Sequence, residues 1–275
     1  MEPPEEILCE GRVWIPTKGG GMETIGRFLN GRILGGNMVL FGVEISPRSL
    51  STFRAGQYVH VEWIDPPLPE AKGEGRSFFV ASPPAELPFL SFLTRIDESP
   101  FKKSLAMATE GVPMRISGPF GSFTLPGLLG GADWLSPIVL IMEGVGISAA
   151  RSLILDGIPR APTLPFFLFF LARHEETLPF RSQWLSLERK HPTFHFEEIF
   201  LEAGTGFPQT DPASLEGPGD RVLPRVFEIV GERDVRRSEF YLSGSLGVVE
   251  SVRGALLCAG IHSERIQTEP CLELS

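Results

Sequence analysis

The chain has few cysteines, no basic block and no apolar run long enough to cross a membrane. Its three cysteines, Cys9, Cys258 and Cys271, are odd in number and far apart. This spacing excludes a disulfide framework and a CxxC-type cradle for a metal ion or an iron–sulfur cluster, so we expect no metal and a reducing compartment. The longest apolar run, residues 164–172, is interrupted by Pro165 and is shorter than the about 20 residues that span a bilayer.

The charge of the chain also limits its function. A net charge of −9 without a cluster of Lys and Arg argues against a nucleic acid as ligand. Residues 1–6 are acidic and proline-rich where a secretory signal would be basic and then apolar. We therefore expect a cytoplasmic protein without a membrane span, and its 275 residues suit two domains of ordinary size.

The first half of the chain has the pattern of a small β-barrel. Residues 1–25 are rich in proline and glycine, and we expect an N-terminal extension to which we assign no function. Residues 26–130 contain six short apolar segments separated by turn residues, which predict an antiparallel barrel or sandwich. The expected strands are residues 27–34, 38–45, 58–63, 77–81, 90–96 and 113–117. A helix is expected at residues 101–109, with Ser99 as N-cap and Pro100 at the first helical position.

Residues 136–275 alternate between strands and helices. The apolar run 138–142 is typical of a buried parallel strand, and it leads into Gly144, Gly146 and Ala149, which fit the GxGxxG/A dinucleotide fingerprint. We expect the following helix at residues 150–156, ended by the glycine and proline at 157 and 159. Further strands are expected at 166–171, 193–200 and 240–242, and further helices at 180–190, 223–230 and 248–259. This series predicts a parallel α/β domain that binds a nucleotide.

Three turns or strand ends carry candidate ligand-binding residues. Arg76 enters a strand next to two aromatic rings, which suits a ligand with a phosphate at one end and a flat ring at the other. The alternative is a core strand with a surface arginine. Lys102 and Lys103 lie at the start of a helix, where free N–H groups and positive charge can bind an anion. The alternative is an ordinary helix whose lysines are solvated. Ser243 and Gly244 form a second glycine turn at the end of a strand, where open α/β sheets bind ligands.

In this order the motifs resemble those of the ferredoxin-NADP reductase superfamily of flavin reductases, over nearly all of residues 26–269. The sequence of residues 53–59, which leads into a barrel strand, is similar to the corresponding segment of the family. The matching motifs are 76–82 for Arg-x-Tyr-Ser-x-x-Ser, 118–123 for Gly-Pro-Phe-Gly-x-Phe, 144–147 for the Gly-Gly-x-Gly-Ile-x-Pro turn and 241–249 for Tyr-x-Cys-Gly-Pro-x-x-Met-Val. Residues 143–153 look closest to members that serve as electron-transfer subunits of larger redox enzymes.

The resemblance implies a Greek-key barrel that binds FAD at residues 26–130 and an α/β domain that binds NAD(P)H at residues 136–275. It implies that Arg76 binds the FAD pyrophosphate, that Phe78 stacks on the flavin, and that the catalytic positions beside the reacting rings are Phe78, Phe79 and Ser243. The other implied cofactor-binding residues are Val80, Ser82, Lys102, Lys103, Ser104 and Gly118 for FAD, and Gly144, Gly146, Ser148, Arg173 and Gly244 for the nicotinamide dinucleotide.

The implied function is an FAD-dependent oxidoreductase that takes a hydride from NAD(P)H and passes electrons to a separate protein, such as a ferredoxin, an iron–sulfur subunit or an oxygenase. Two departures keep open an alternative, a non-catalytic or regulatory subunit with weakened nicotinamide use. Phe78-Phe79 replaces Tyr-Ser, and Glu143 replaces the first glycine of the turn, where it repels phosphate unless it turns away. Arg173 favours NADPH and the acidic residues at 175–176 favour NADH, so the choice stays open.

Overall fold

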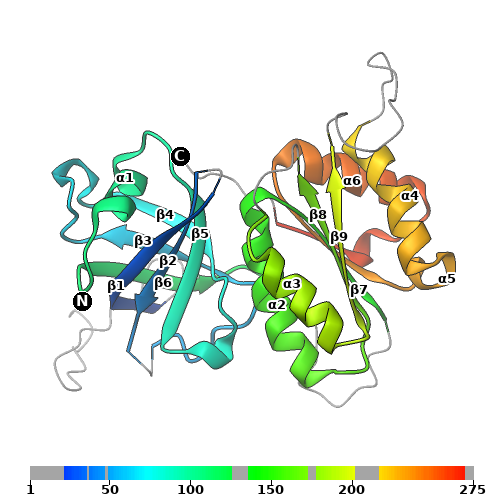
Figure 1. Ribbon diagram of the computed structural model, residues 1–275, viewed down its shortest axis with the longest axis horizontal. Helices are drawn as coiled ribbons and strands as arrows, with labels where there is room; N and C mark the ends of the chain where they lie inside the picture. The colour runs from blue at the N-terminus through cyan, green and yellow to red at the C-terminus, as the bar shows by residue number, and fades with distance from the viewer. Residues whose placement is uncertain are drawn as a thin grey trace, which may run out of the picture. The chain divides into compact units, whose positions relative to one another are not determined.

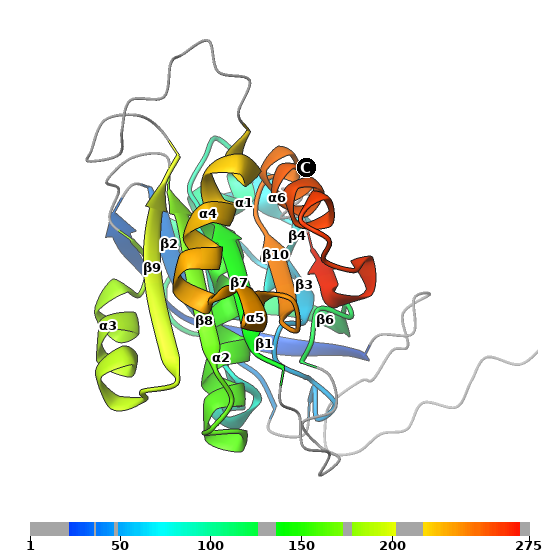
Figure 2. The same ribbon diagram turned by 90° about the vertical axis from the view of Figure 1, so that its right-hand side faces the viewer.

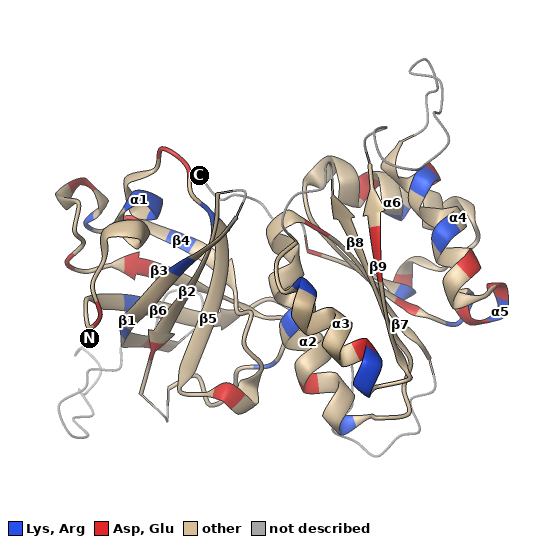
Figure 3. Cartoon of the chain, viewed as in Figure 1, with Lys and Arg blue, Asp and Glu red and all other residues tan. Residues whose placement is uncertain are grey.

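The computed structural model describes residues 22–35, 37–46, 49–125, 136–172, 178–201 and 217–269. The chain forms two compact units, residues 1–124 with 274–275 and residues 125–273, which we call unit 1 and unit 2 (Figure 1). Lys and Arg are interspersed with Asp and Glu over the described parts of both units (Figure 3).

Unit 1 is built around an antiparallel sheet of six strands in the order β4-β3-β6-β1-β2-β5. The strands are β1 (Met22–Gly35), β2 (Met38–Glu44), β3 (Tyr58–Trp63), β4 (Gly75–Phe79), β5 (Phe89–Arg95) and β6 (Pro113–Phe120). After β4, the Ala81 backbone N–H donates to the Ser91 carbonyl of β5 at 2.7 Å, so the two ends of the sheet meet and the barrel nearly closes. The six predicted strands are confirmed, and β1 begins five residues before its expected start; residues 1–21 lie outside the described part.

Aromatic and branched side chains fill the interior of the barrel. Phe28, Trp63 and Phe101 are almost fully buried. The ring centroid of Trp63 lies 5.9 Å from that of Phe28 and 5.8 Å from that of Phe101. The helix α1 (Pro100–Met107) packs Phe101 and Leu105 into the barrel core, and the Trp63 indole N–H donates to the Phe101 carbonyl at 3.1 Å. Short 3₁₀ turns lie at η1 (Pro69–Ala71) and η2 (Pro84–Glu86). The predicted helix is confirmed, and its first turn is anchored to the core.

Unit 2 contains a parallel sheet of five strands in the order β11-β10-β7-β8-β9. The strands are β7 (Ile138–Glu143), β8 (Phe166–Ala172), β9 (Phe194–Phe200), β10 (Glu239–Ser243) and β11 (Ile266–Thr268). The chain runs outward from β7 through β8 to β9 and then returns to place β10 on the other side of β7. The strand order therefore reverses between β7 and β10, the position at which such sheets bind ligands.

Helices cover both faces of this sheet. They are α2 (Ile147–Arg160), α3 (Arg181–Lys190), α4 (Pro218–Val230), α5 (Glu232–Val235) and α6 (Leu246–Cys258), with 3₁₀ turns η3 (Gly144–Gly146) and η4 (Ser263–Arg265). The helices α4 and α6 pack side by side over one face, while α2 and α3 lie on the other (Figures 1 and 2). The strands β7 and β8 are buried almost throughout because both of their faces are covered.

Two helix boundaries differ from those expected by four residues or more. The helix α2 does not end at Gly157 and Pro159 but continues to Arg160. Gly157 is explained by packing, because a Cβ there would lie 2.6 Å from the Phe166 ring. The helix α4 begins at Pro218, five residues before its expected start, since proline is well suited to the first turn. The short elements α5 and β11 were not predicted from the sequence.

Candidate functional site

Two glycine turns meet at the point where the strand order of unit 2 reverses. The first, Gly144–Gly146, follows β7, and the second begins at Ser243, the last residue of β10 and the register partner of Met142 in β7. A Cβ on Gly146 would lie 2.8 Å from the Ser243 carbonyl oxygen, so glycine is required for the turns to approach this closely. The sequence predicted both turns, and the structure brings them together.

Glu143 connects the two turns. One oxygen of its carboxylate accepts hydrogen bonds from the Ser245 backbone N–H at 2.8 Å and from the Ser245 hydroxyl at 2.5 Å. Ser245 is the N-cap residue of α6, so the carboxylate lies near the positive end of that helix. Gly244 leaves room for this contact, since a Cβ there would lie 2.6 Å from the Glu143 Cβ. The Glu143 side chain therefore points towards the second glycine turn and accepts hydrogen bonds from Ser245, a partner that the sequence did not indicate.

Two buried serines belong to the same region. Ser148 is the second residue of α2 and is 1% exposed, and its hydroxyl has no hydrogen-bond partner among the described residues. A buried hydroxyl without a partner is unfavourable, so this oxygen has an unmet need for a hydrogen bond. The Ser243 hydroxyl donates to the Glu269 carbonyl at 2.7 Å, and burial raises the pKa of the Glu269 carboxyl. Arg173 lies outside the described residues.

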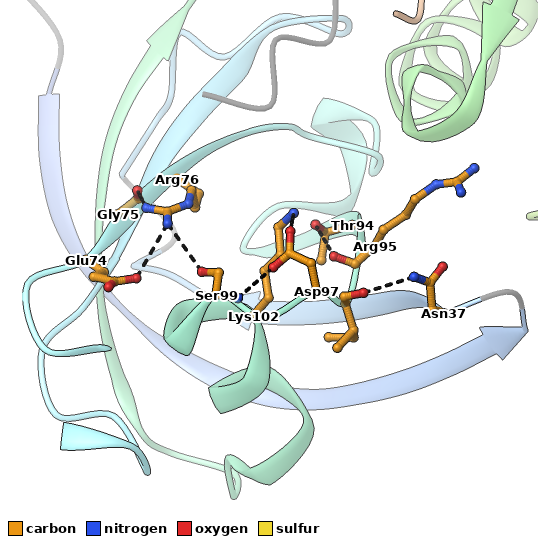
Figure 4. Close-up of polar contacts among 10 residues, drawn as sticks. Asn37, Glu74, Gly75, Arg76, Thr94, Arg95, Asp97, Ser99 and Lys102 are labelled. Atoms are coloured by element: carbon orange, nitrogen blue, oxygen red, sulfur yellow. Dashed lines mark hydrogen bonds and ion pairs between the residues drawn. The ribbon is translucent and has the colours of Figure 1, made fainter. Parts of the chain in front are cut away.

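In unit 1, the guanidinium of Arg76 reaches the start of α1 (Figure 4). Its Nη2 donates to the Ser99 hydroxyl at 3.3 Å and lies 3.5 Å from a Glu74 carboxylate oxygen, and its Nη1 donates to the Gly75 carbonyl at 2.8 Å. Ser99 is the N-cap residue, but its side chain makes no capping bond. An arginine fork beside the first turn of a helix is suited to a phosphate.

Two lysines on α1 are bound to acidic residues that precede the helix. Lys102 Nζ lies 2.7 Å from the Asp97 carboxylate, and Lys103 Nζ lies 2.5 Å from that of Glu98. The Lys102 side chain is only 7% exposed, whereas that of Lys103 is 43% exposed. In the first pair a buried lysine therefore meets a carboxylate whose side chain is 47% exposed (Figure 4), whereas both side chains of the second pair are open to water.

The electrostatics of Asp97 follow from these neighbours. Burial alone would raise the pKa of its carboxyl, but hydrogen bonds from Lys102 and the Ser99 backbone N–H lower it, as do the charges of Lys102 and Arg76. The balance is a pKa below the ordinary value for aspartate. Asp97 was not predicted as a site residue. An acidic residue five positions before a lysine of the helix could have indicated this ion pair from the sequence.

The other predicted flavin-site residues follow β4 or lie in α1 and β6. Val80 and Ser104 are fully buried, and the Ser104 hydroxyl has no hydrogen-bond partner among the described residues. The Ser82 hydroxyl accepts a hydrogen bond from the Ser91 backbone N–H at 3.1 Å. Gly118 has a φ of +144°, and a Cβ there would lie 3.1 Å from a methyl group of Val59.

Phe78 and Phe79 point to opposite sides of β4. Phe78 is 7% exposed and belongs to the core, where its ring centroid lies 5.3 Å from Phe41 and 5.7 Å from Phe101. Phe79 is half-buried and faces Tyr58, with ring centroids 6.4 Å apart and ring planes at 87°. Of the two predicted rings, Phe79 is the more exposed, and Tyr58 beside it was not predicted as a site residue.

A cavity of about 230 Å³ lies elsewhere in unit 2. It is lined by side chains of β8, β9, α3 and α4, including Phe167, His195, Glu197 and Arg225. Its strand residues belong to the N-terminal halves of β8 and β9, whereas the glycine turns follow the C-terminal ends of β7 and β10, so we assign it no role in the candidate site. Within the described ranges, no cluster of His, Cys, Asp and Glu could hold a metal ion, and no helix is long and apolar enough to cross a bilayer.

Known proteins with similar sequences are named as reductases or as subunits or components of reductases. No protein-family profile matches the chain. It is 25% identical over 199 residues to one subunit of the Na⁺-translocating NADH-quinone reductase of Chlamydia felis, a match covering 65% of this chain and 44% of that protein. It is 30% identical over 167 residues to the reductase component of phenol 2-monooxygenase of Pseudomonas sp. strain CF600, covering 59% of this chain and 43% of that protein. The matches thus span less than half the length of these relatives.

Similar solved structures share the two-unit architecture. The cytochrome P450 reductase GcoB of Amycolatopsis has a TM-score of 0.72 at 20% identity, covering 90% of this chain and 69% of that one. A ferredoxin-NADP⁺ reductase of Neisseria gonorrhoeae, solved with bound FAD and NADP, has a TM-score of 0.67 at 19% identity, covering 90% of this chain and 98% of that one. The resemblance seen in the sequence is therefore confirmed, and the chain has the two-domain fold of the ferredoxin-NADP reductase superfamily.

Proposed function

We propose that this chain is an FAD-dependent reductase, which takes a hydride from NAD(P)H and passes electrons to a separate redox protein. Residues 26–130 are the proposed FAD-binding domain and residues 136–275 the proposed NAD(P)-binding domain. The observation that carries the proposal is the placement of Arg76, whose guanidinium lies beside the first turn of α1 at the same strand motif that resembles the flavin site of the family.

The residues of unit 1 fit FAD. Arg76 and the first turn of α1 offer a cation and a helix N-terminus to a pyrophosphate, and the Ser104 hydroxyl behind them has no hydrogen-bond partner among the described residues. The half-buried rings of Phe79 and Tyr58 are the aromatic groups proposed to contact an isoalloxazine. Bound FAD supplies the step from two-electron to one-electron transfer, while the chain binds it, orients it and excludes water.

The residues of unit 2 fit a nicotinamide dinucleotide. Gly144 and Gly146 allow the backbone to approach a pyrophosphate, and the unpartnered hydroxyl of Ser148 lies at the start of α2. The Ser243 hydroxyl is held by the Glu269 carbonyl at 2.7 Å, which fixes this side chain at the end of β10. These residues bind and position the nucleotide, and they hold no group that performs acid–base chemistry.

The proposed electron acceptor is a separate protein. The relatives are named as a reductase component and as a subunit, which supports a partner such as a ferredoxin, an iron–sulfur subunit or an oxygenase. Their names and those of the structural neighbours include both NADH and NADP, so the proposal leaves both nucleotides to experiment. The low cysteine content favours a cytoplasmic location.

One observation favours a second function, a subunit that keeps FAD but has lost nicotinamide use. The Glu143 carboxylate is held at the meeting point of the two glycine turns, where the phosphates of a dinucleotide would approach. The visible spectrum of the purified chain, recorded before and after anaerobic addition of NADH or NADPH, separates the two functions. Flavin bands that bleach support the reductase; bands that only dithionite bleaches support the second function. A colourless protein that takes up no FAD contradicts both.

A further inference from the structure

Glu143 and Ser245 form a pair that joins two turns 102 residues apart in sequence. Each stands where the family motif that this chain resembles has another residue, glycine at position 143 and proline at position 245. Neither of those residues has a side chain that could form this contact. The two departures therefore complement one another, because the carboxylate at 143 needs the donors that serine supplies at 245.

The pair fixes a negative charge at the C-terminal end of the central strand β7. The Ser245 backbone N–H and hydroxyl both donate to one carboxylate oxygen, at 2.8 and 2.5 Å. The contact lies at the N-terminus of α6, whose positive dipole end stabilises an anion. An anion bound in this way satisfies donors that would otherwise be available to a phosphate.

Resting on the proposed function, we infer that Glu143 is an affinity-determining residue for the nicotinamide dinucleotide. Its carboxylate serves as an internal anion, which occupies the donors of the second turn and repels the phosphates of the ligand. Nucleotide binding is therefore weakened and not abolished. Like charges in a partly solvated site repel modestly, so the effect corresponds to about a fivefold difference in the dissociation constant.

The test is a titration of the purified full chain with NADH and with NADPH, measured by isothermal calorimetry. The Glu143→Gln variant keeps an acceptor for Ser245 but removes the charge, and we expect it to bind both nucleotides about fivefold more tightly. The gain should shrink as salt is raised from about 0.1 M to 1 M, because the Debye length falls from about 10 Å to about 3 Å. The matched control is Glu250→Gln, which removes the same charge from an exposed position on α6, the helix whose N-cap residue is Ser245.

The outcomes separate this inference from the proposed function. Unchanged or weaker binding by Glu143→Gln, with measurable binding by the unaltered chain, overturns the inference and leaves the reductase standing. Absence of binding by the unaltered chain and by all variants overturns nicotinamide use itself, and the inference with it. Thermal unfolding checks that each variant is folded. If Glu143→Gln does not fold, Glu143→Ala replaces it in the titration.

Discussion

Gly146 and Ser243 lie so close that a Cβ on residue 146 would be 2.8 Å from the Ser243 carbonyl oxygen and 2.9 Å from its Oγ. This contact joins the turn after β7 to the end of β10. The obstacle includes backbone atoms, which cannot rotate away as the end of a long side chain can. The close approach of the two turns therefore depends on a single absent methyl group.

We expect Gly146→Ala to destabilise the protein by about 1–3 kcal/mol, because the extra carbon forces β7 and β10 apart at their ends. Urea unfolding of the full chain measures the loss. Gly254→Ala is the matched control, since that glycine lies inside α6 with open space where a Cβ would be. The control should be neutral or stabilising by up to about 1 kcal/mol. Equal effects of the two substitutions would show that the contact is relieved at little cost.

Arg76→Gln should weaken FAD binding by roughly tenfold, because a charge-assisted bond to phosphate is lost. Titration of FAD into the apoprotein, followed by quenching of flavin fluorescence, measures the dissociation constant. Arg32→Gln serves as control because this arginine is exposed on β1. If both variants bind FAD like the unaltered chain, the pyrophosphate does not lie at Arg76.

The strands of the barrel and the first glycine turn could be predicted from the sequence because their signals are local. Turn residues bound each strand, and Gly144 and Gly146 stand between an apolar run and a helix. The extent of α2 was wrong because Gly157 has a distant cause, its packing against Phe166. A glycine that makes room for a neighbour looks the same in sequence as one that ends a helix.

The partner of Glu143 could not be predicted, because it lies 102 residues away and depends on the register of β7 with β10. The same limit applies to the two phenylalanines of β4. Alternation in a strand predicts that Phe78 and Phe79 face opposite sides, but not which side is the core. That is set by pairing with β3, where Phe78 lies opposite the buried Val59 and Phe79 opposite Tyr58.

The two rings should respond differently to truncation. Phe78→Ala removes a core ring that packs against Phe41 and Phe101, so we expect a loss of about 3–5 kcal/mol in the free energy of unfolding. Phe79→Ala should lower stability by about 1 kcal/mol, since this ring is only half-buried. It should instead change the visible spectrum of bound FAD. A spectrum that responds only to the change at Phe78 would place the flavin on the other face of β4.

The Asp97–Lys102 pair should make stability depend on pH in the acid range. The pKa of Asp97 is lowered in the folded protein, so its contribution is present above the ordinary carboxyl pKa of about 3.9 and is lost as the pH falls through the folded value. Asp97→Asn should therefore reduce stability at pH 7 by about 1 kcal/mol, a figure kept small because the Asp97 side chain is 47% exposed. Near pH 2 the variant and the unaltered chain should unfold alike.

Glu98→Gln is the matched control for this pair, because Glu98 also binds a lysine of α1 but is 96% exposed. Solvent screens that pair, so we expect no measurable change in stability at either pH. Thermal unfolding between pH 2 and pH 7 compares the three proteins. If the difference between Asp97→Asn and the unaltered chain were the same at both ends of this range, the carboxylate charge would not be its source. The loss at pH 7 would then reflect the geometry of the turn before α1, where the Ser99 backbone N–H donates to Asp97 at 2.9 Å.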